Sequence, residues 1–196
     1  VFQETNRLLQ AYGQDVVLRT SVPYSGPFEF LLNGAGVLNI YFAIHSVILL
    51  LKHKPDLVHV HNFSSRVSPL TILALKIAKK FISFSLIHTA HDFHLTCPNT
   101  GFLRYVKGED FETCTRCASH GGWIHVLKFR CDRRGLAMSL VRYLRHKVFY
   151  DILHLESAFD CVICPSNTLK RFLESRFPHI RTVLVRNPSF RADDRV

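Results

Sequence analysis

Residues 56–89 decide the fold, and they read DLVHVHNFSSRVSPLTILALKIAKKFISFSLIHT. The apolar, β-branched run Asp56–His61 predicts a buried parallel strand, and Ile82–Thr89 predicts a second one. Between the two runs, Ser68 is placed to cap a helix that begins at Pro69. A strand, a helix and a strand at this spacing form a βαβ unit, whose strands lie parallel in one sheet.

The same alternation of strands and helices extends outward from this unit. A loop is expected around Pro23, Gly26 and Pro27. The other expected elements are helices at Val1–Tyr12, Asn33–His53, Leu136–Ser157 and Asn167–Phe172, and strands at Asp15–Thr20, Phe159–Cys164 and Val183–Val185. The chain is therefore expected to form an α/β fold with a doubly wound, mainly parallel, Rossmann-like sheet.

Two of these helices have informative apolar patterns. The longest apolar stretch, Val37–Leu51, contains polar residues and is shorter than the roughly 20 residues that span a bilayer, so a buried helix is favoured over a membrane-inserted one. The later helix carries an apolar stripe made of Leu136, Leu140, Tyr143, Leu144, Val148 and Ile152.

Length and charge limit the function classes. A chain of 196 residues is expected to form a single domain, 1–196, and because it begins at Val1 inside a helical pattern, its start is expected to be truncated. The formal net charge of +10 suits an anionic partner such as nucleic acid, a phospholipid surface or a phosphorylated substrate, without choosing among them.

Polar residues gather where the expected strands end, which is where open parallel sheets bind ligands. The groups are His59, His61 and Asn62; His88, Thr89, His91 and Asp92; and Ser166 with Asn167. A partly buried strand position is the preferred interpretation of His59, and a helix cap accounts for Ser166. For His61, His91 and Asp92 together, a functional site is favoured, because imidazole titrates near neutral pH.

These residues also carry a resemblance to a known family. The runs KPDLVHVHN (54–62), HTAHDFHLTCPN (88–99), CVICPSNTLKRFL (161–173) and VLVRNP (183–188) resemble, in order and spacing, the N-terminal domain of family 4 retaining glycosyltransferases. The resemblance covers nearly the whole chain and is strongest between Lys54 and Asn99. It implies a GT-B architecture, in which two Rossmann-like domains face each other across a cleft.

The resemblance also implies roles for individual residues. His91 would contact the donor sugar or its phosphate, Asp92 would orient that loop, and the substrate-binding set would be His61, Asn62, Thr89, Ser166 and Asn187. The chain would be the acceptor-binding half of a hexosyltransferase that uses a nucleotide sugar as co-substrate, in bacterial surface polysaccharide, lipopolysaccharide or glycolipid synthesis. The acceptor would be a sugar or a lipid-linked sugar.

The chain departs from the family pattern in two places. The first strand with its glycine-rich loop and the C-terminal donor-binding domain have no counterpart, and neither do the basic residues and paired glutamates that serve the donor. Transfer requires stabilisation of the departing nucleoside diphosphate, so this half is expected to be inactive alone.

A cysteine-rich insertion is expected at 93–134. Cys97, Cys114, Cys117 and Cys131 include one CxxC pair, which suits a structural zinc site, while free thiols or a disulfide stay open as alternatives. Cys161 and Cys164 are interpreted as core residues of a strand.

Basic residues crowd the end of the insertion and the helix expected after it. Lys128, Arg130, Arg133, Arg134, Arg142, Arg145 and Lys147 form a solvated helix face or a surface for an anionic membrane. Peripheral attachment at the inner face of the plasma membrane of a cytoplasmic protein is therefore expected. The rival hypotheses are a zinc-stabilised nucleic-acid-binding protein, for which no known recognition motif is present, and a non-catalytic phosphate- or nucleotide-binding module, for which no phosphate-loop motif is present.

Overall fold

The computed structural model describes most of the chain, and the fold rests on these residues: 2–18, 20, 38–64, 67–107, 110–119, 122–129 and 131–187. Several expectations lie outside the described residues: the loop at 23–27, the first part of the expected helix at 33–53, Val1, Arg130 and Pro188.

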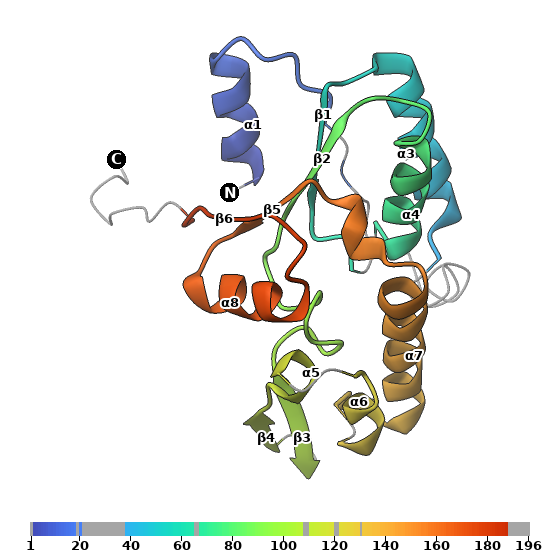
Figure 1. Ribbon diagram of the computed structural model, residues 1–196, viewed down its shortest axis with the longest axis vertical. Helices are drawn as coiled ribbons and strands as arrows, with labels where there is room; N and C mark the ends of the chain where they lie inside the picture. The colour runs from blue at the N-terminus through green and yellow to red at the C-terminus, as the bar shows by residue number, and fades with distance from the viewer. Residues whose placement is uncertain are drawn as a thin grey trace.

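Four parallel strands form the central sheet in the order β1-β2-β5-β6 (Figure 1). Their bounds are Leu57–His61 for β1, Ser85–Thr89 for β2, Cys161–Cys164 for β5 and Thr182–Leu184 for β6. These confirm the strands predicted at the corresponding places. The chain is a mixed α/β fold whose all-parallel sheet is flanked by helices, consistent with a Rossmann-like arrangement. The strands follow chain order, so the reversal that defines a doubly wound sheet stays a prediction.

Three helices flank this sheet. Helix α4 (Pro69–Ala78) makes the crossover from β1 to β2, and α8 (Asn167–Arg176) makes the crossover from β5 to β6. Helix α3 (Ile40–His53) lies beside α4 (Figure 1). The predicted βαβ unit is thus confirmed, and α8 is longer than the sequence pattern indicated.

The starts of α3 and α4 are stabilised by different groups. The side chain of Asn39 accepts a hydrogen bond from the backbone N–H of Phe42 at 2.9 Å, which caps α3. Ser68 occupies the N-cap position predicted for it, directly before Pro69, but its side chain makes no cap bond in α4. Its Oγ instead accepts a hydrogen bond from the Asn39 backbone N–H at 3.2 Å, so Ser68 links the starts of the two helices.

The core lies between the sheet and its helices. Its fully buried side chains come from strands, helices and the loops between them, and they include Phe63, Ile72, Leu86, Leu155, Val162 and Leu173. Leu86 belongs to β2, an interior strand of the sheet, whereas Leu57 at the start of β1 is 50% exposed.

The cysteine-rich segment is more ordered than its sequence indicated. The absence of periodicity from Asp92 to Arg134 predicted an irregular loop, but the segment contains an antiparallel hairpin and two short helices below the main sheet (Figure 1). These are β3 (Leu103–Lys107), β4 (Asp110–Thr113), α5 (Arg116–Ser119) and α6 (His125–Lys128). Elements of four or five residues are too short to show a hydrophobic period in the sequence.

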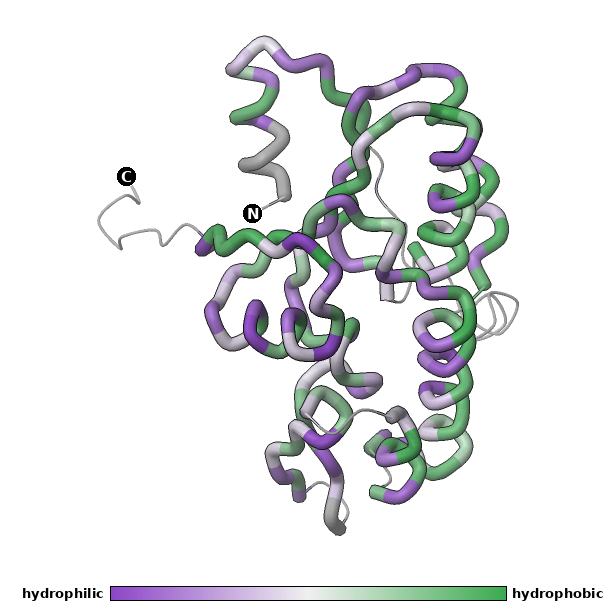
Figure 2. The backbone as a smooth tube through the Cα atoms, viewed as in Figure 1, coloured by the Kyte–Doolittle hydropathy of each residue, from purple (hydrophilic) through white to green (hydrophobic). Residues whose placement is uncertain are grey.

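The long helix expected at 136–157 is present in three pieces. Helix α7 (Leu136–His146) continues into the π-helix η2 (Lys147–Ile152), and the 3₁₀ helix η3 (Leu155–Ala158) follows. The apolar stripe of this helix does not face the core: Leu136, Leu140, Leu144, Val148 and Ile152 are all exposed. Figure 2 shows hydrophobic residues along the outer side of α7. Only Tyr143 of the predicted stripe packs against the core.

Near the N-terminus, one prediction is confirmed and one is wrong. Helix α1 (Phe2–Ala11) is present and ends before Gly13, whose φ of 74° suits glycine. The strand predicted at Asp15–Thr20 is not formed, because the described residues 14–18 and 20 have no regular structure and pair with no strand. Within the described residues, no helix has both the length and the apolar character needed to cross a membrane.

Replacing Leu86 with Ala should lower the free energy of unfolding by about 2–5 kcal/mol, because it leaves a cavity under an interior strand. The matched control, Leu57→Ala on the adjacent strand, should cost less than about 1 kcal/mol, since Leu57 is half exposed. Urea unfolding followed by circular dichroism measures both. Equal losses in the two variants would contradict the assignment of β2 to the core.

Candidate functional site at the carboxyl ends of the strands

The ends of β1 and β2 bring three imidazoles together. The strand register pairs His61 with Thr89, so the loops that follow the two strands start side by side. His61 Nδ1 lies 2.9 Å from His91 Nε2, and the two rings stack with centroids 5.2 Å apart. His59 lies on the same face of β1, with its ring centroid 4.2 Å from that of His61. The structure therefore joins His61 and His91, as the site hypothesis requires.

His59 is anchored to the neighbouring strand. Its Nε2 lies 2.8 Å from Thr89 Oγ1. This contact agrees with the interpretation of His59 as a partly buried strand residue, and it also occupies the hydroxyl of Thr89, one of the expected substrate-binding groups. Thr89 itself is buried.

All three imidazoles favour the neutral form. Burial, and then repulsion from His59 and His91, lowers the pKa of His61 to about 4. Burial also lowers the pKa of His59 and of His91, although the nearby Asp92 opposes the shift at His91. At neutral pH the His61–His91 contact is thus a hydrogen bond between two uncharged rings, in which one ring donates and the other accepts. Such a pair can exchange a proton or a hydrogen bond with a bound ligand.

Asp92 orders the loop after β2. Its Oδ1 accepts hydrogen bonds from the backbone N–H of His94 at 2.9 Å and from His94 Nδ1 at 2.7 Å. Burial raises the pKa of Asp92, but the hydrogen bonds and charge of His94 outweigh it, so the pKa is lowered overall. The carboxylate therefore stays ionised and closes an Asx-type turn directly after His91.

A buried polar seam, made of His94, Arg142, Arg145 and His146, ties this loop to α7. His146 Nε2 lies 2.8 Å from the His94 carbonyl oxygen, and its Nδ1 lies 3.1 Å from the Arg142 carbonyl oxygen. Arg142 and Arg145 both donate to the carbonyl of Pro98, at 2.7 and 3.3 Å, and Arg145 also donates to the Ser64 carbonyl at 3.0 Å. The loops after β1 and β2 are thus held by one helix.

This seam was not predicted from the sequence. The only sequence signal for the His94 contact is the D-x-H spacing from Asp92, which suits an Asx turn. His88, which the sequence placed with the polar residues at the strand end, is fully buried instead. Its Nδ1 donates to the Val60 carbonyl at 2.9 Å, and burial lowers its pKa well below the ordinary value. In the described part of the chain, His88 Nε2 and His94 Nε2 have no hydrogen-bond partner.

The remaining predicted site residues have structural roles or lie at the surface. Ser166 Oγ accepts the backbone N–H of Leu169 at 3.2 Å, so it caps α8 at the end of β5. Asn62 is exposed with φ of 36°, and its Oδ1 accepts a hydrogen bond from Ser64 Oγ. Asn187 is exposed beyond β6. The helix-cap interpretation of Ser166 is therefore the one that the geometry supports.

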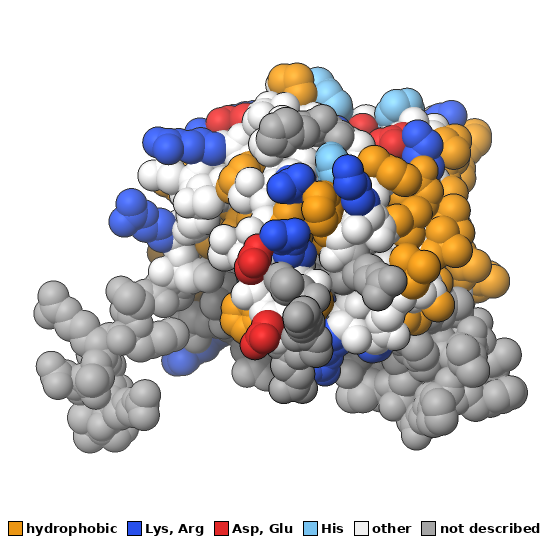
Figure 3. Space-filling view, turned by 90° about the horizontal axis from the view of Figure 1, so that it is seen from below, with side chains coloured by type: hydrophobic (Ala, Val, Ile, Leu, Met, Phe, Trp, Pro, Cys, Tyr) orange, Lys and Arg blue, Asp and Glu red, His pale blue; other side chains and the backbone are white. Residues whose placement is uncertain are grey.

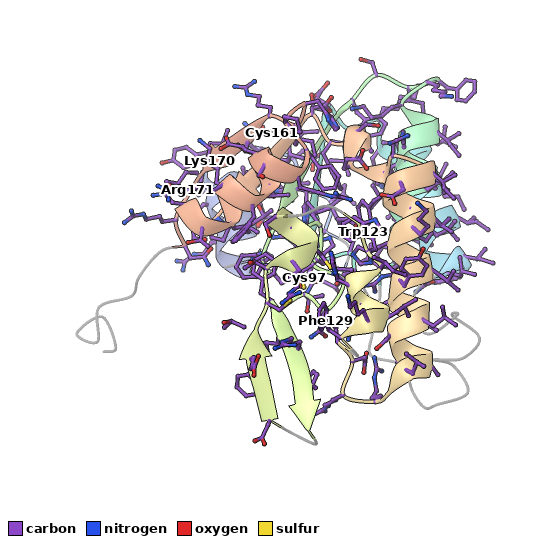
Figure 4. All side chains as sticks on the ribbon, turned by 60° about the horizontal axis from the view of Figure 1, so that its bottom comes forward. Cys97, Trp123, Phe129, Cys161, Lys170 and Arg171 are labelled. Carbon is purple, nitrogen blue, oxygen red and sulfur yellow. The ribbon has the colours of Figure 1, made fainter. Side chains whose placement is uncertain are left out.

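The four cysteines of the insertion come from four different places. Cys97 follows the loop after β2, Cys114 follows β4, Cys117 belongs to α5, and Cys131 follows α6. Figure 4 shows Cys97 above the hairpin and beneath α5. The backbone N–H of Cys114 donates to the Phe102 carbonyl at 2.6 Å, which brings the end of β4 back to the turn that follows Cys97.

The electrostatics of these cysteines show that they are neighbours. Each of the six pairs among Cys97, Cys114, Cys117 and Cys131 has a charge repulsion that raises the pKa of one of its members. Burial, followed by this repulsion, raises the pKa of Cys117 and of Cys131 to about 12. Thr100 donates its backbone N–H to the Cys97 carbonyl oxygen at 2.8 Å, and burial raises the pKa of the Cys97 thiol.

All six cysteines are free thiols in this structure. Cys164 is buried in β5 and its neighbour Cys161 is partly buried, which agrees with their interpretation as strand residues. Among the described residues, no three side chains of His, Cys, Asp or Glu already form a group that could hold a metal ion.

The comparisons with known proteins identify no relative: no family model matches the chain, and no curated protein or solved structure matches it significantly.

The buried histidines should make stability depend on pH. His61, His88 and His146 have lowered pKa values in the folded protein, whereas in the unfolded chain they bind protons near pH 6.5. Below that pH the unfolded state binds more protons, so the free energy of unfolding should fall between about pH 6.5 and 4 and stay flat above. Urea titrations at intervals of pH measure this. His88→Phe should reduce the slope, and a stability that is constant down to pH 4.5 would contradict the assignment.

Proposed function

We propose that this chain is the acceptor-binding half of a nucleotide-sugar-dependent glycosyltransferase. The observation that carries the proposal is the contact between His61 and His91 at 2.9 Å, at the carboxyl ends of two adjacent parallel strands. Ligands of open α/β sheets bind at this edge. The four runs of sequence that resemble family 4 glycosyltransferases follow these strands, and two of them contain His61 and His91.

The local chemistry suits sugar hydroxyl groups. A neutral imidazole offers one donor and one acceptor nitrogen, and hydroxyl groups both donate and accept, so the His61–His91 pair can hydrogen-bond a sugar or its phosphate without bringing in a fixed charge. His91 is exposed, which allows it to contact a ligand, whereas Asp92 is engaged by His94 and positions the loop. We therefore assign ligand contact to His91 and a positioning role to Asp92.

The nucleotide sugar would be bound mainly by a second, C-terminal domain, and the reaction would need both halves. Stabilising the departing diphosphate requires positive groups beside it. Three of the arginines in the basic region, Arg134, Arg142 and Arg145, are already engaged by Asp132 or by backbone carbonyls. We therefore assign to this half the binding of the acceptor and the contact of His91 with the donor, and we assign the stabilisation of the diphosphate to the second domain. Polysaccharide or glycolipid assembly on the inner face of the plasma membrane is the setting we propose.

His91→Ala should lower sugar transfer by at least about 100-fold in a protein that contains both halves, because it removes a group that contacts the donor. His53→Ala is the matched control: His53 is an exposed residue at the end of α3 and should leave the rate unchanged. The measurement is the release of nucleoside diphosphate with acceptor present. A His91→Ala protein that keeps more than half of the wild-type rate of sugar transfer would contradict the proposal.

We also propose that the four thiols of the insertion bind a structural Zn²⁺. Burial and mutual repulsion raise the pKa of Cys97, Cys117 and Cys131, and a divalent cation bound by the four sulfurs would relieve the repulsion between their thiolates. A cysteine sulfur moves by rotation about a single bond, so side-chain rotation can bring these neighbours toward a tetrahedral site. Cys97 packs with Phe102 and Ala118 in a small cluster while Cys117 and Cys131 belong to the main core, so a metal ion bound by these cysteines would tie the insertion to the core and stabilise folding.

The protein purified without chelator should carry about one Zn²⁺ per chain, and a chelator should lower its melting temperature. Cys117→Ser should abolish the bound zinc, whereas Cys161→Ser, in β5, should keep it. Elemental mass spectrometry and thermal unfolding give the two readouts. Equal zinc content in the two variants, or a wild-type protein without zinc that unfolds at the same temperature with chelator, would contradict the site.

A further inference from the structure

Helix α7 and its extension η2 have their apolar side turned outward. Exposed apolar residues recur at every fourth position along 17 residues: Leu136 is 55% exposed, Leu140 44%, Leu144 50%, Val148 39% and Ile152 62%. We call these five residues the outer row. A helix at the surface of a globular protein ordinarily buries its apolar side and exposes its polar one, so this arrangement is inverted.

The inward side of α7 carries polar residues whose contacts determine its orientation, whereas η2 buries Phe149 and Tyr150. Ser139 and His146 are buried, and Arg142 donates to the Asp132 carboxylate at 2.6 Å and to the Pro98 carbonyl. Rotating α7 to bury the outer row would break these bonds and the His146–His94 contact, leaving buried polar groups unpaired. The hydrogen bonds on the inner side of α7 therefore keep the outer row exposed.

The outer row is part of a larger apolar side of the molecule. Helices α3, α4 and α7 lie along the same side in both views (Figures 1 and 4). Helix α3 exposes Ile40, Tyr41, Ile44, Ile48 and Leu51, and an apolar groove of about 530 Å³ separates it from α4, lined by Val47, Leu51, Ala74, Ile77 and Phe81 among others. Exposed apolar side chains gathered on one side of a molecule in this way are typical of an interaction surface.

Positive charge lies next to the outer row. A polar pocket of about 230 Å³ is lined by Asn99, Tyr105, Asp132, Arg133, Arg134 and Arg142. With three arginines and one carboxylate, the pocket has a net charge of +2. Arg133 and Arg134 lie just before Gly135, the N-cap of α7. Figure 3, which views the molecule from below, shows Lys and Arg side chains beside the hydrophobic surface that occupies the side of α7.

We propose that the outer row and the arginine pocket form a docking surface for an anionic phospholipid bilayer. The apolar side chains would enter the boundary between headgroups and acyl chains, as those of interfacial helices do, and Arg133, which lines the pocket beside the two arginines that bind Asp132, would contact a lipid phosphate. Charge favours a membrane over a second copy of this chain, since two chains of net charge +10 repel each other while anionic lipid attracts them. The inference goes beyond sugar transfer and does not depend on it.

Vesicle sedimentation tests this surface without donor or acceptor sugar. The full chain should pellet with phosphatidylcholine vesicles that contain about 30% phosphatidylglycerol, and much less with phosphatidylcholine alone. Leu140→Glu combined with Leu144→Glu should weaken binding at least about tenfold. Tyr12→Glu, which changes an 81% exposed aromatic residue just after α1, should bind as the wild type does. Arg133→Glu should reduce the preference for anionic vesicles.

Thermal unfolding and sedimentation velocity separate the other outcomes. Both charged residues of the double variant replace exposed side chains, so its melting temperature should stay within a few degrees of the wild type. If the double variant is unfolded, the Arg133→Glu variant provides the test instead. Unchanged binding of Arg133→Glu to anionic vesicles would then contradict the proposed docking surface. Wild-type protein that stays in the supernatant with both vesicles overturns the proposal. So does a wild-type dimer that the double variant dissociates, because a second copy would then cover the outer row.

Discussion

The hydrogen bonds between α7 and the loop after β2 are the constraint on which the rest of the structure depends. His146 Nε2 contacts the His94 carbonyl, His94 binds Asp92, and Arg142 and Arg145 converge on the Pro98 carbonyl. This seam is buried, where unpaired polar groups are costly, so its bonds must form together or not at all. It sets the position of the loop that carries His91, of the turn that carries Cys97, and of the helix itself.

Three features follow from that one constraint. The loop after β2 is held so that His91 meets His61 across the strand ends, and the turn after Pro98 is closed by a hydrogen bond from the Thr100 backbone N–H to the Cys97 carbonyl. The helix is rotated so that its polar side faces inward and its leucines face outward. The sugar site, the metal site and the membrane surface that we propose are therefore held by one set of bonds. A change in the seam would disturb all of them.

The candidate site was predictable from sequence only in part. His61 and His91 follow β-branched runs, and adjacent parallel strands end at one edge, so their proximity could be inferred. The burial of His88 could not be inferred, because it results from packing against Phe63 and Phe159, which belong to other segments of the chain. Nor could the outward rotation of α7 be inferred, since an apolar stripe indicates the core unless buried polar partners on other segments compete for the inner side.

The sequence by itself determined the parallel βαβ unit, the strands that follow it and the histidines at their ends, because local propensity and hydrophobic period act within a few residues. Only the tertiary structure decided which polar groups are buried, which cysteines are neighbours and which side of α7 meets the solvent. These outcomes depend on hydrogen bonds and charges between residues such as His94 and His146, 52 positions apart, and no local pattern in a single sequence specifies such pairs.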